Sequence, residues 1–359
     1  MQIRFISPGE YHEWDSFVDN SPQGDVFCYS WWLSTVTDNN FRILAVWKNN
    51  LICAAMILPF FDSGVINEPP LTRTLGVLFR RTENIEPYHA KSEERKYLIA
   101  LVEHLPKERF VQMCMSDNFT DWLPFLWKGY KQKNRCTYLI DYREQSLESI
   151  RKNISINQKR NIIKAINSGA KIIASGTVEQ LYELSCITYK RQGIRFHYSF
   201  SLLKKLDTQL AEKNMRVIFS SVFPDGKVHG IYYTMWTGKK VYGWQMASDD
   251  IQRDNGGNAL LLYSVIEYFY KKADTFNFGG SDIERIEKYL RQFGGKMVPY
   301  FHIFNDEMLD YSQQESLEKT LMYSKILFRK SWNRLIGIKL RRIPGFIIKM
   351  LKNKMRIFA

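Results

Sequence analysis

The stretch FNFGGSDIERIEKYLRQFGG, at residues 276–295, decides the fold class of this chain. It predicts a short aromatic strand and a helix, with one glycine pair before the helix at 279–280 and another after it at 294–295. Ser281 or Asp282 is expected to accept N–H groups at the helix start, and the second glycine pair to supply the left-handed residue that ends the helix. Two glycine pairs around one short helix indicate that another part of the molecule, or a ligand, comes close to the backbone there.

Length and composition describe a folded protein of one or two domains. The chain has 359 residues, and its 45% apolar content is typical of a globular protein rather than of a disordered chain. No run of apolar residues is long enough to predict a membrane span, and the first residues read as a strand rather than as a targeting signal. The five cysteines are scattered without metal-ligand spacing, so we expect reduced thiols, no metal and a cytoplasmic protein.

The expected elements follow the same order twice along the chain. Residues 1–145 and residues 146–308 each read as strand, two helices, three strands, helix, strand, helix and strand. We therefore predict an α/β protein with two similar domains and mixed sheets. A long helix at 147–168 is expected to join them, with the boundary at 142–146. Residues 309–359 form a third segment, a C-terminal tail.

The positive charge of the chain is concentrated in this tail. Of the 51 Lys and Arg residues, 11 lie in residues 325–359, where there is no Asp or Glu. Apolar residues such as Phe328, Trp332 and Leu335 recur at helical spacing, so a basic amphipathic helix is predicted. Such a helix favours an anionic membrane surface. A helix docked on the body and contact with tRNA phosphates are the alternatives, whereas DNA binding is not expected.

Six segments in this order resemble the FemAB superfamily, which is built from two GNAT-like domains. They are YHEWDSFVDNSPQGDVFCYSWWL (11–33), EPPLTRTLGVLF (68–79), NQKRNIIKAINSGAKI (157–172), TYKRQGIRFHY (188–198), NGGNALLLYSVIEYF (255–269) and FNFGGSDIERIEKYLRQFGGKMVPYFHIF (276–304). The resemblance covers residues 9–305. It implies that the repeated α/β order is a pair of tandem GNAT-like domains.

The resemblance also implies an acyltransferase. In this superfamily an acyl or aminoacyl group passes from an activated ester or thioester to an amine, which requires a donor held in line and a stabilised oxyanion. We expect an N-acyltransferase that modifies an amine of a small-molecule or lipid-linked cell-envelope precursor, an amino sugar or a peptide, at the inner membrane face. The work of such an enzyme is polysaccharide or peptidoglycan biosynthesis.

The expected donor is acyl-CoA, which is a co-substrate and not a tightly bound cofactor. One alternative is an aminoacyl-tRNA-dependent peptidoglycan-bridge aminoacyltransferase. The other is a non-catalytic GNAT-like scaffold.

The donor site implied by GNAT-like domains is a glycine-rich loop at a helix start, where backbone N–H groups hold phosphate. Arg253, Gly256, Gly257 and Asn258 occupy the matching stretch and are expected to bind the donor. Arg253 and Gly256 fit the family pattern Gln/Arg-x-x-Gly-x-Gly/Ala, whereas Asn258 stands where a small residue is usual. An ordinary capped helix start explains the same residues without a ligand.

The segment TYKRQGIRFHY is interpreted as the acceptor side of the site. Arg191 and Arg195 are expected to pair with a carboxylate or phosphate, and Tyr198 to contact the same substrate. His197 is expected to relay the proton of the attacking amine, because the reference pKa of histidine lies near neutrality. A helix C-terminus capped by Gly193 is the structural alternative.

Further residues of the predicted site lie on strands and around the glycine pairs. Tyr233, Trp244 and Gln245 lie on adjacent strands and are expected to line the cleft, although core packing is the commoner role of a strand aromatic. Asp282 is expected to act as a base or to orient one, and Ser281 to hydrogen-bond the substrate, unless both only cap the helix. The glycine pairs would then bring this segment against the donor pocket.

Bridge-forming members of the superfamily carry an aromatic–Lys pair in their closing motif. Alignment on Phe293 places Tyr289 at the aromatic position and Leu290 at the Lys position, so the Lys is absent. Arg291 and Lys288 flank this position, and Arg291 is the expected substitute. The absence of the Lys argues against aminoacyl-tRNA as the donor.

Truncation after Tyr323 is predicted to release the protein from anionic lipid vesicles in a co-sedimentation assay. Each basic residue near such a surface contributes about 1 kcal/mol of attraction, and the truncation removes all of those in residues 325–359. Unchanged binding of the truncated chain would exclude the tail as a membrane anchor.

Overall fold

The secondary structure alternates between helix and strand in both halves of the chain. The computed structural model describes residues 1–305 except 64, 82–85 and 106–109. The first-half elements are β1 (Gln2–Phe5), α1 (Tyr11–Asn20), α2 (Ser30–Thr37), β2 (Phe41–Lys48), β3 (Leu51–Pro59), β4 (Val65–Ile66), β5 (Val77–Phe79), α3 (Pro87–Glu103), β6 (Phe110–Cys114), α4 (Leu123–Trp127) and β7 (Lys131–Asp141). The second-half elements are α5 (Leu147–Asn153), α6 (Ile156–Asn167), β8 (Lys171–Ile173), α7 (Val178–Arg191), α8 (Phe200–Glu212), β9 (Arg216–Val222), β10 (Val228–Thr237), β11 (Lys240–Ser248), α9 (Asp250–Asp254), α10 (Gly257–Phe269), β12 (Thr275–Asn277), α11 (Glu284–Arg291) and β13 (Lys296–Phe304). The predicted α/β fold class is confirmed, and β4 and α9 are short elements beyond the predicted order.

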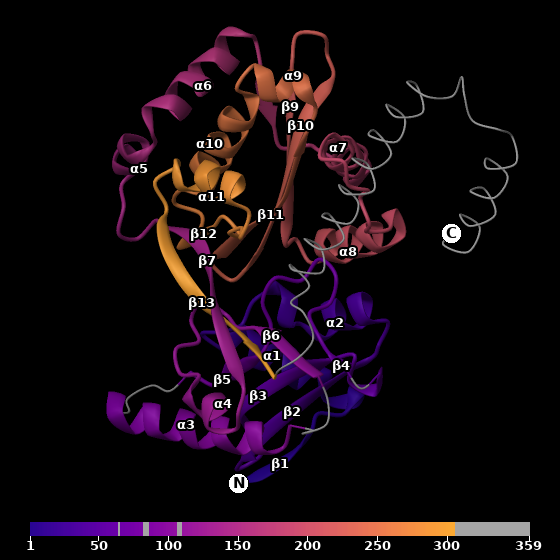
Figure 1. Ribbon diagram of the computed structural model, residues 1–359, viewed down its shortest axis with the longest axis vertical. Helices are drawn as coiled ribbons and strands as arrows, with labels where there is room; N and C mark the ends of the chain where they lie inside the picture. The colour runs from indigo at the N-terminus through magenta and orange to yellow at the C-terminus, as the bar shows by residue number, and fades with distance from the viewer. Residues whose placement is uncertain (64, 82–85, 106–109, 306–359) are drawn as a thin grey trace, which may run out of the picture. The chain divides into compact units, whose positions relative to one another are not determined.

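Strands from the two halves are interleaved in one large sheet. The nine-stranded sheet has the order β4-β6-β13-β7-β12-β11-β10-β9-β8, and a separate sheet has the order β1-β2-β3-β5. The last strand, β13, therefore lies between the first-half strands β6 and β7, and Figure 1 shows β7 and β13 running side by side. Parallel pairs β4–β6 and β11–β12 make the large sheet mixed. The halves share a hydrogen-bond ladder and cannot part without breaking it.

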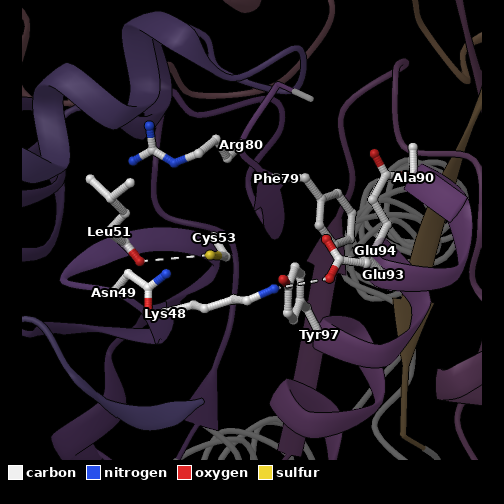
Figure 2. Close-up of a pocket in the computed structure, with 10 residues that line it drawn as sticks. All are labelled: Lys48, Asn49, Leu51, Cys53, Phe79, Arg80, Ala90, Glu93, Glu94 and Tyr97. Atoms are coloured by element: carbon white, nitrogen blue, oxygen red, sulfur yellow. Dashed lines mark hydrogen bonds and ion pairs between the residues drawn. The ribbon is translucent and has the colours of Figure 1, made fainter. Parts of the chain in front are cut away.

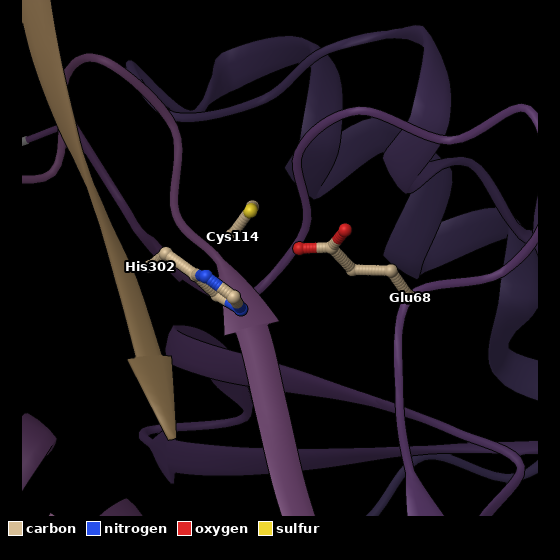
Figure 3. A group of neighbouring side chains, drawn as sticks. All are labelled: Glu68, Cys114 and His302. Carbon is tan, nitrogen blue, oxygen red and sulfur yellow. The ribbon is translucent and has the colours of Figure 1, made fainter. Parts of the chain in front are cut away.

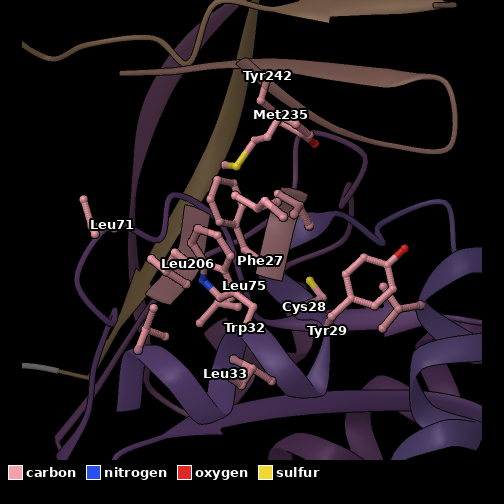
Figure 4. Packing of buried hydrophobic residues seen from close by; sticks show 14 of the residues in the cluster. Phe27, Cys28, Tyr29, Trp32, Leu33, Leu71, Leu75, Leu206, Met235 and Tyr242 are labelled. Atoms are coloured by element: carbon pink, nitrogen blue, oxygen red, sulfur yellow. The ribbon is translucent and has the colours of Figure 1, made fainter. Parts of the chain in front are cut away.

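Apolar packing also joins the halves. Phe27 packs edge-on against Tyr242 at 5.8 Å between ring centroids, and Trp32 packs against Trp244 at the same separation. Figure 4 shows this packing, in which residues after α1 and on α2 meet residues of α8, β10 and β11. Aromatic pairs of this kind combine large buried area with a preferred geometry. They fix the orientation of one half against the other.

Helices cover both faces of the second-half strands. The apolar sides of α7 and α8 pack with Tyr233 and Trp244 on one face. The apolar sides of α6 and α10 pack with Tyr232 and Val241 on the other face. The alternation of inward-facing residues along β10 and β11 follows from the two-residue period of a strand.

Two predicted elements differ from the structure for local reasons. The expected helix at 147–168 is two helices, because Ile154 is extended and the Ser155 hydroxyl caps α6 by accepting from the Gln158 N–H. The extended segment expected near 71–79 forms a strand only at Val77–Phe79, since Leu71 takes a positive φ of 62° in the preceding loop. The predicted boundary between 145 and 146 stays a prediction, and the tail at 309–359 lies outside the described residues.

Within the described ranges, none of the helices combines the length and apolar character that crossing a membrane requires.

Gly280→Ala is predicted to lower the free energy of unfolding far more than Gly129→Ala. Both glycines have positive φ, 59° and 86°, which costs an L-residue about 1–2 kcal/mol. A Cβ at Gly280 would also lie 2.1 Å from the Cys136 carbonyl oxygen, whereas a Cβ at Gly129 meets nothing within 4 Å. Urea unfolding of both variants measures the difference. Equal destabilisation would show that the turn at Gly280 is not packed as described.

Candidate functional site

The parallel strands β11 and β12 stop pairing where β11 bulges. Their last paired residues are Tyr242 and Asn277. Just beyond this point the register of β11 against β10 shifts, so that Trp244 is an extra residue on β11. A bulge bends its strand and interrupts local pairing. The backbone carbonyl groups beyond it therefore need partners from elsewhere.

Arg73 supplies these partners from the other half of the chain. Its Nη2 donates to the Trp244 carbonyl oxygen at 2.9 Å, and its Nη1 donates to the Gly279 carbonyl oxygen. A Cβ at Gly279 would lie 2.4 Å from the Arg73 guanidinium carbon. Only glycine allows the guanidinium to lie this close, and φ at Gly279 is +82°.

Asn277 fixes the turn that follows β12. Its side-chain oxygen accepts from the Thr137 hydroxyl at 2.6 Å and from the Gly279 N–H at 2.8 Å. Gly280 lies against the backbone of β7. The second glycine pair lies elsewhere: a Cβ at Gly294 would meet Asn153, the last residue of α5. The predicted close approach is therefore made to Arg73, β7 and the end of α5, and packing of this segment against a donor pocket stays a prediction.

Two cavities meet at the end of the paired part of β11 and β12. A small cavity of about 20 Å³ is lined by Arg73, Thr74, Asp117, Thr137, Tyr242, Asn277, Gly279 and Tyr300. A larger one of about 590 Å³ is lined by the end of α1 and the loop after it, the end of β7, the β10–β11 turn and the start of β12. Asp117, Tyr242 and Asn277 line both cavities. The larger volume is in the usual range for a small-molecule site.

The larger cavity has charges of both signs. They belong to Asp19, Arg81, Asp117, Asp141, Arg143, Lys239, Lys240 and Asp274. Asp141 and Arg143 pair with each other, whereas the Asp117 carboxylate has Lys240 Nζ at 3.8 Å. Among the described residues, Lys240 Nζ has no hydrogen-bond partner although it is buried. A molecule with both an ammonium and an anionic group would find a counter-charge for each.

Asp25 lies in the apolar interior near Lys240, with 1% of its surface exposed. Its carboxylate accepts from the Thr74 hydroxyl at 2.6 Å and from the Phe27 N–H at 2.9 Å. Burial raises the pKa of the Asp25 carboxyl to about 6, against the opposing effects of Lys240 and these hydrogen bonds. Thr74 neighbours Arg73, so Asp25 helps to hold the loop that carries the guanidinium.

A third cavity, of about 200 Å³, lies in the first half (Figure 2). It is lined by the β2–β3 turn, the end of β5 and one side of α3, with Lys48 Nζ 3.2 Å from Glu93 Oε1. None of the predicted site residues lines it, and it is not lined by any residue of the other two cavities.

The predicted acceptor residues lie at the end of α7 and in the segment after it, and they do not line these cavities. Arg191 Nη1 donates to the Ser248 carbonyl oxygen at 3.2 Å and pairs with Asp250 at 3.1 Å. His197 is exposed and packs on Tyr198 with ring centroids 4.1 Å apart, and Arg195 is exposed. None of these four lines a cavity described above. Their role toward an acceptor stays a prediction.

The predicted cleft residues divide into core and surface. Tyr233 is fully buried, and its hydroxyl donates to Asp207 at 3.0 Å, which is the core role weighed above. Gln245 pairs with it across the strands and is half-buried. The structure therefore places Tyr233, and likewise Trp244, in the core rather than at a cleft.

The residues around α11 have structural partners. The Ser281 hydroxyl accepts from the Ile283 N–H at 3.1 Å, but Ile283 is the N-cap of α11 and no side chain of the described residues caps this helix, so the expected cap by Ser281 or Asp282 is wrong. Asp282 pairs with Arg135 Nε at 3.2 Å, and the exposed Arg291 pairs with Glu287 at 3.2 Å. Leu290 is buried with 9% of its surface exposed. Because this position is buried, it suits an apolar side chain and disfavours a Lys.

The predicted donor loop forms the start of α10. Gly256 takes a left-handed conformation and is the N-cap, and a Cβ there would lie 2.3 Å from the Asn161 carbonyl oxygen. Gly257 and Asn258 begin the helix, so their N–H groups have no partner within it. Arg253 is exposed and pairs with Asp254 at 3.4 Å.

Gln252 is a residue of this loop that pattern reasoning missed. Its side chain is fully buried, and a Cβ at Gly257 would lie 2.3 Å from its Oε1. Among the described residues, neither polar atom of its amide has a hydrogen-bond partner, and the Asn258 Oδ1 has none either. A buried polar atom without a hydrogen bond lowers the stability of the fold. The amide of Gln252 and the Asn258 Oδ1 are therefore candidate partners for a polar group of a ligand.

Asp25→Asn is predicted to flatten the loss of stability between pH 4 and pH 6. The pKa of Asp25 is about 6 in the folded protein and near 4 in the unfolded chain, so the folded state binds the extra proton. This contribution is present below pH 4 and is lost as the pH rises through 6, at about 1.4 kcal/mol for each unit of difference. Urea unfolding of both proteins at each pH measures it. Parallel pH profiles would contradict the assignment.

Comparison with known proteins agrees with the fold described above. Residues 157–289 match a family model described as acetyltransferase (GNAT) domain. A crystal structure of FemX is similar over 89% of this chain and 100% of its own, with a TM-score of 0.61 and 16% identity. The structure of L-PGS from Bacillus licheniformis is similar over 90% of this chain and 97% of its own, with a TM-score of 0.50 and 10% identity.

A tandem GNAT protein from the clavulanic acid biosynthesis pathway, solved without AcCoA, covers 86% of this chain and 100% of its own, with a TM-score of 0.50 and 10% identity. A search of curated protein sequences gives no match. The structural similarities concern the fold, and the family match concerns the second half. Residues 157–289 are therefore similar to a GNAT acetyltransferase domain, and the fold over most of the chain is similar to those of FemX and of a tandem GNAT protein, as the resemblance stated above leads us to expect.

Proposed function

We propose that this protein transfers an acyl group from acyl-CoA to an amine of a cell-envelope precursor, an amino sugar or a peptide. The observation that carries the proposal is the small cavity at the separation of β11 and β12, where the guanidinium of Arg73 and the carboxylate of Asp117 line the same space. A cation and an anion at one such point suit the two charges that acyl transfer develops.

The two charges arise on different atoms of the transition state. The amine nitrogen attacks the carbonyl carbon, so an oxyanion develops while the nitrogen becomes positive. Arg73 has five N–H donors, of which its bonds to Trp244 and Gly279 use two. Its remaining N–H groups are suited to the oxyanion.

The Asp117 carboxylate is suited to accept the proton of the attacking amine. Its side chain lines both cavities and is 9% exposed. As the C–N bond forms, the nitrogen gives its proton to the Asp117 carboxylate, and the thioester C–S bond breaks to release the thiolate of coenzyme A. The protein itself forms no covalent bond in this sequence, which agrees with a site that needs no nucleophilic side chain.

The donor end of the proposal rests on the start of α10. The N–H groups of Gly257 and Asn258 and the positive end of the helix dipole suit a pyrophosphate. The unpaired amide of Gln252 lies beside Gly257 and offers both a donor and an acceptor. Arg253 is exposed and adds a positive charge at the rim.

The acceptor end rests on the larger cavity. Its mixed charges suit a precursor that carries an ammonium group together with a phosphate or carboxylate. Because Asp117 belongs to both cavities, an amine bound here can reach an acyl carbonyl beside Arg73. The resemblance to the FemAB superfamily supports an envelope precursor, and the predicted basic tail supports action at a membrane surface.

Asn258→Asp is predicted to abolish most of the thermal stabilisation by acetyl-CoA. The wild type at 100 times its Kd should gain about 2.7 kcal/mol, seen as a rise in Tm. A carboxylate at the second residue of α10 repels the pyrophosphate but suits a helix N-terminus, so the fold is preserved. Ser201→Asp is the matched control, because it adds the same charge at the second residue of α8, on the opposite face of the sheet.

The outcomes of this titration separate the candidate donors. Loss of the shift in Asn258→Asp alone supports the acyl-CoA donor. An equal shift in both variants contradicts donor binding at α10. A shift with aminoacyl-tRNA only would favour the peptidoglycan-bridge alternative, and no shift with either donor would favour the scaffold.

A further inference from the structure

We propose that Glu68, Cys114 and His302 form a binding site for one zinc ion. They come from the loop between β4 and β5, from the end of β6 and from β13 (Figure 3). One ligand atom of each lies within 4.8 Å of those of the other two. His302 and Cys114 are direct partners across β13 and β6, so the backbone ladder holds two of the ligands at a fixed spacing.

The buried imidazole of His302 is the feature that indicates a bound ligand. It has 1% of its surface exposed, and in the described part of the chain neither imidazole nitrogen has a hydrogen-bond partner. A buried imidazole normally donates through one nitrogen and accepts through the other, because leaving them unpaired costs stability. Coordination of a metal through one nitrogen would remove much of that cost.

The three side chains match the chemistry of zinc. Zinc binds thiolate, imidazole and carboxylate together, and carboxylate-rich sites without sulfur suit magnesium or calcium instead. Three protein ligands leave a fourth position for water. Positions 68, 114 and 302 are far apart in the chain, which is why cysteine spacing predicted no metal.

The positive charge of Arg135 lies beside two of the three ligands, and a bound zinc ion would have to tolerate it. Its Nη1 lies 3.1 Å from Cys114 Sγ and 3.6 Å from Glu68 Oε2, and its Nε lies 3.2 Å from Asp282. On binding, the Cys114 thiol gives its proton to solvent, so thiolate and carboxylate together neutralise the divalent ion. Arg135 then keeps Asp282 as its counter-charge.

The site would brace the loop that carries Arg73. Glu68 and Arg73 lie on the same loop between β4 and β5, and the other two ligands lie on strands of the nine-stranded sheet. Zinc would therefore hold this loop to β6 and β13. The zinc site itself does not depend on the proposed acyl transfer, because its test measures metal and not activity.

The test is the metal content of the full chain, purified with an affinity tag that has no histidines from zinc-supplemented cells. Mass spectrometry of the metals should find about one zinc per chain in the wild type. Cys114→Ser and His302→Gln should lower this content at least tenfold. Cys136→Ser is the matched control, because this thiol lies on the neighbouring strand β7 outside the cluster, and it should keep its zinc.

A second measurement decides the matter if the variants fail to fold. Wild-type protein treated with a chelator and refilled with cobalt should show the visible absorption of a cobalt–thiolate bond, and zinc should raise its Tm. A wild type without zinc and without a cobalt–thiolate band would overturn the proposal. So would a Cys114→Ser variant that folds and keeps its zinc.

Discussion

Arg73 donates hydrogen bonds to the carbonyl oxygens of Trp244 and Gly279, and so replaces the ladder bonds that β11 and β12 no longer make to each other. Buried backbone carbonyl groups need such partners. The arginine belongs to the first half of the chain and the carbonyl groups to the second. The gap between β11 and β12 therefore has its present geometry only when both halves are assembled.

Other features of the molecule follow from this contact. Gly279 must lack a side chain because the guanidinium lies where a Cβ would be, and Asn277 holds the turn that presents the carbonyl. The interleaving of β13 between β6 and β7 and the aromatic packing of Phe27 on Tyr242 keep the halves in register. A reacting centre at this seam would join an acceptor in the larger cavity to a donor at α10. This arrangement would make one site from residues of both halves.

The order of the elements could be predicted from the sequence because it depends on local periodicity and turn residues. The sharing of one sheet could not, because the exchange of β13 into the first half depends on pairing between distant strands. The split of the helix at 147–168 depends on a cap by Ser155 inside a stretch that otherwise keeps helical character. Local patterns do not resolve such an interruption.

The predicted site was less complete because chemistry here depends on residues far apart in the chain. The stretch with Arg191 and His197 concentrates functional side chain types, and it lies outside the cavities described. Arg73 and Asp117 were not singled out, although Arg73 lies in the segment at 68–79, because only the fold brings the two residues to one cavity. Gln252 is adjacent to the predicted donor residues, yet nothing in its type signals a buried amide without partners.

The most direct measurement is a crystal structure of the protein with an acyl-CoA bound. We expect the pyrophosphate at the start of α10 and the acyl carbonyl in the gap between β11 and β12, with its oxygen toward Arg73 and its carbon open to an amine that lies beside Asp117. A donor bound in another cavity, with the hydrogen bonds of Arg73 to Trp244 and Gly279 unchanged and its acyl group distant from both residues, would contradict it.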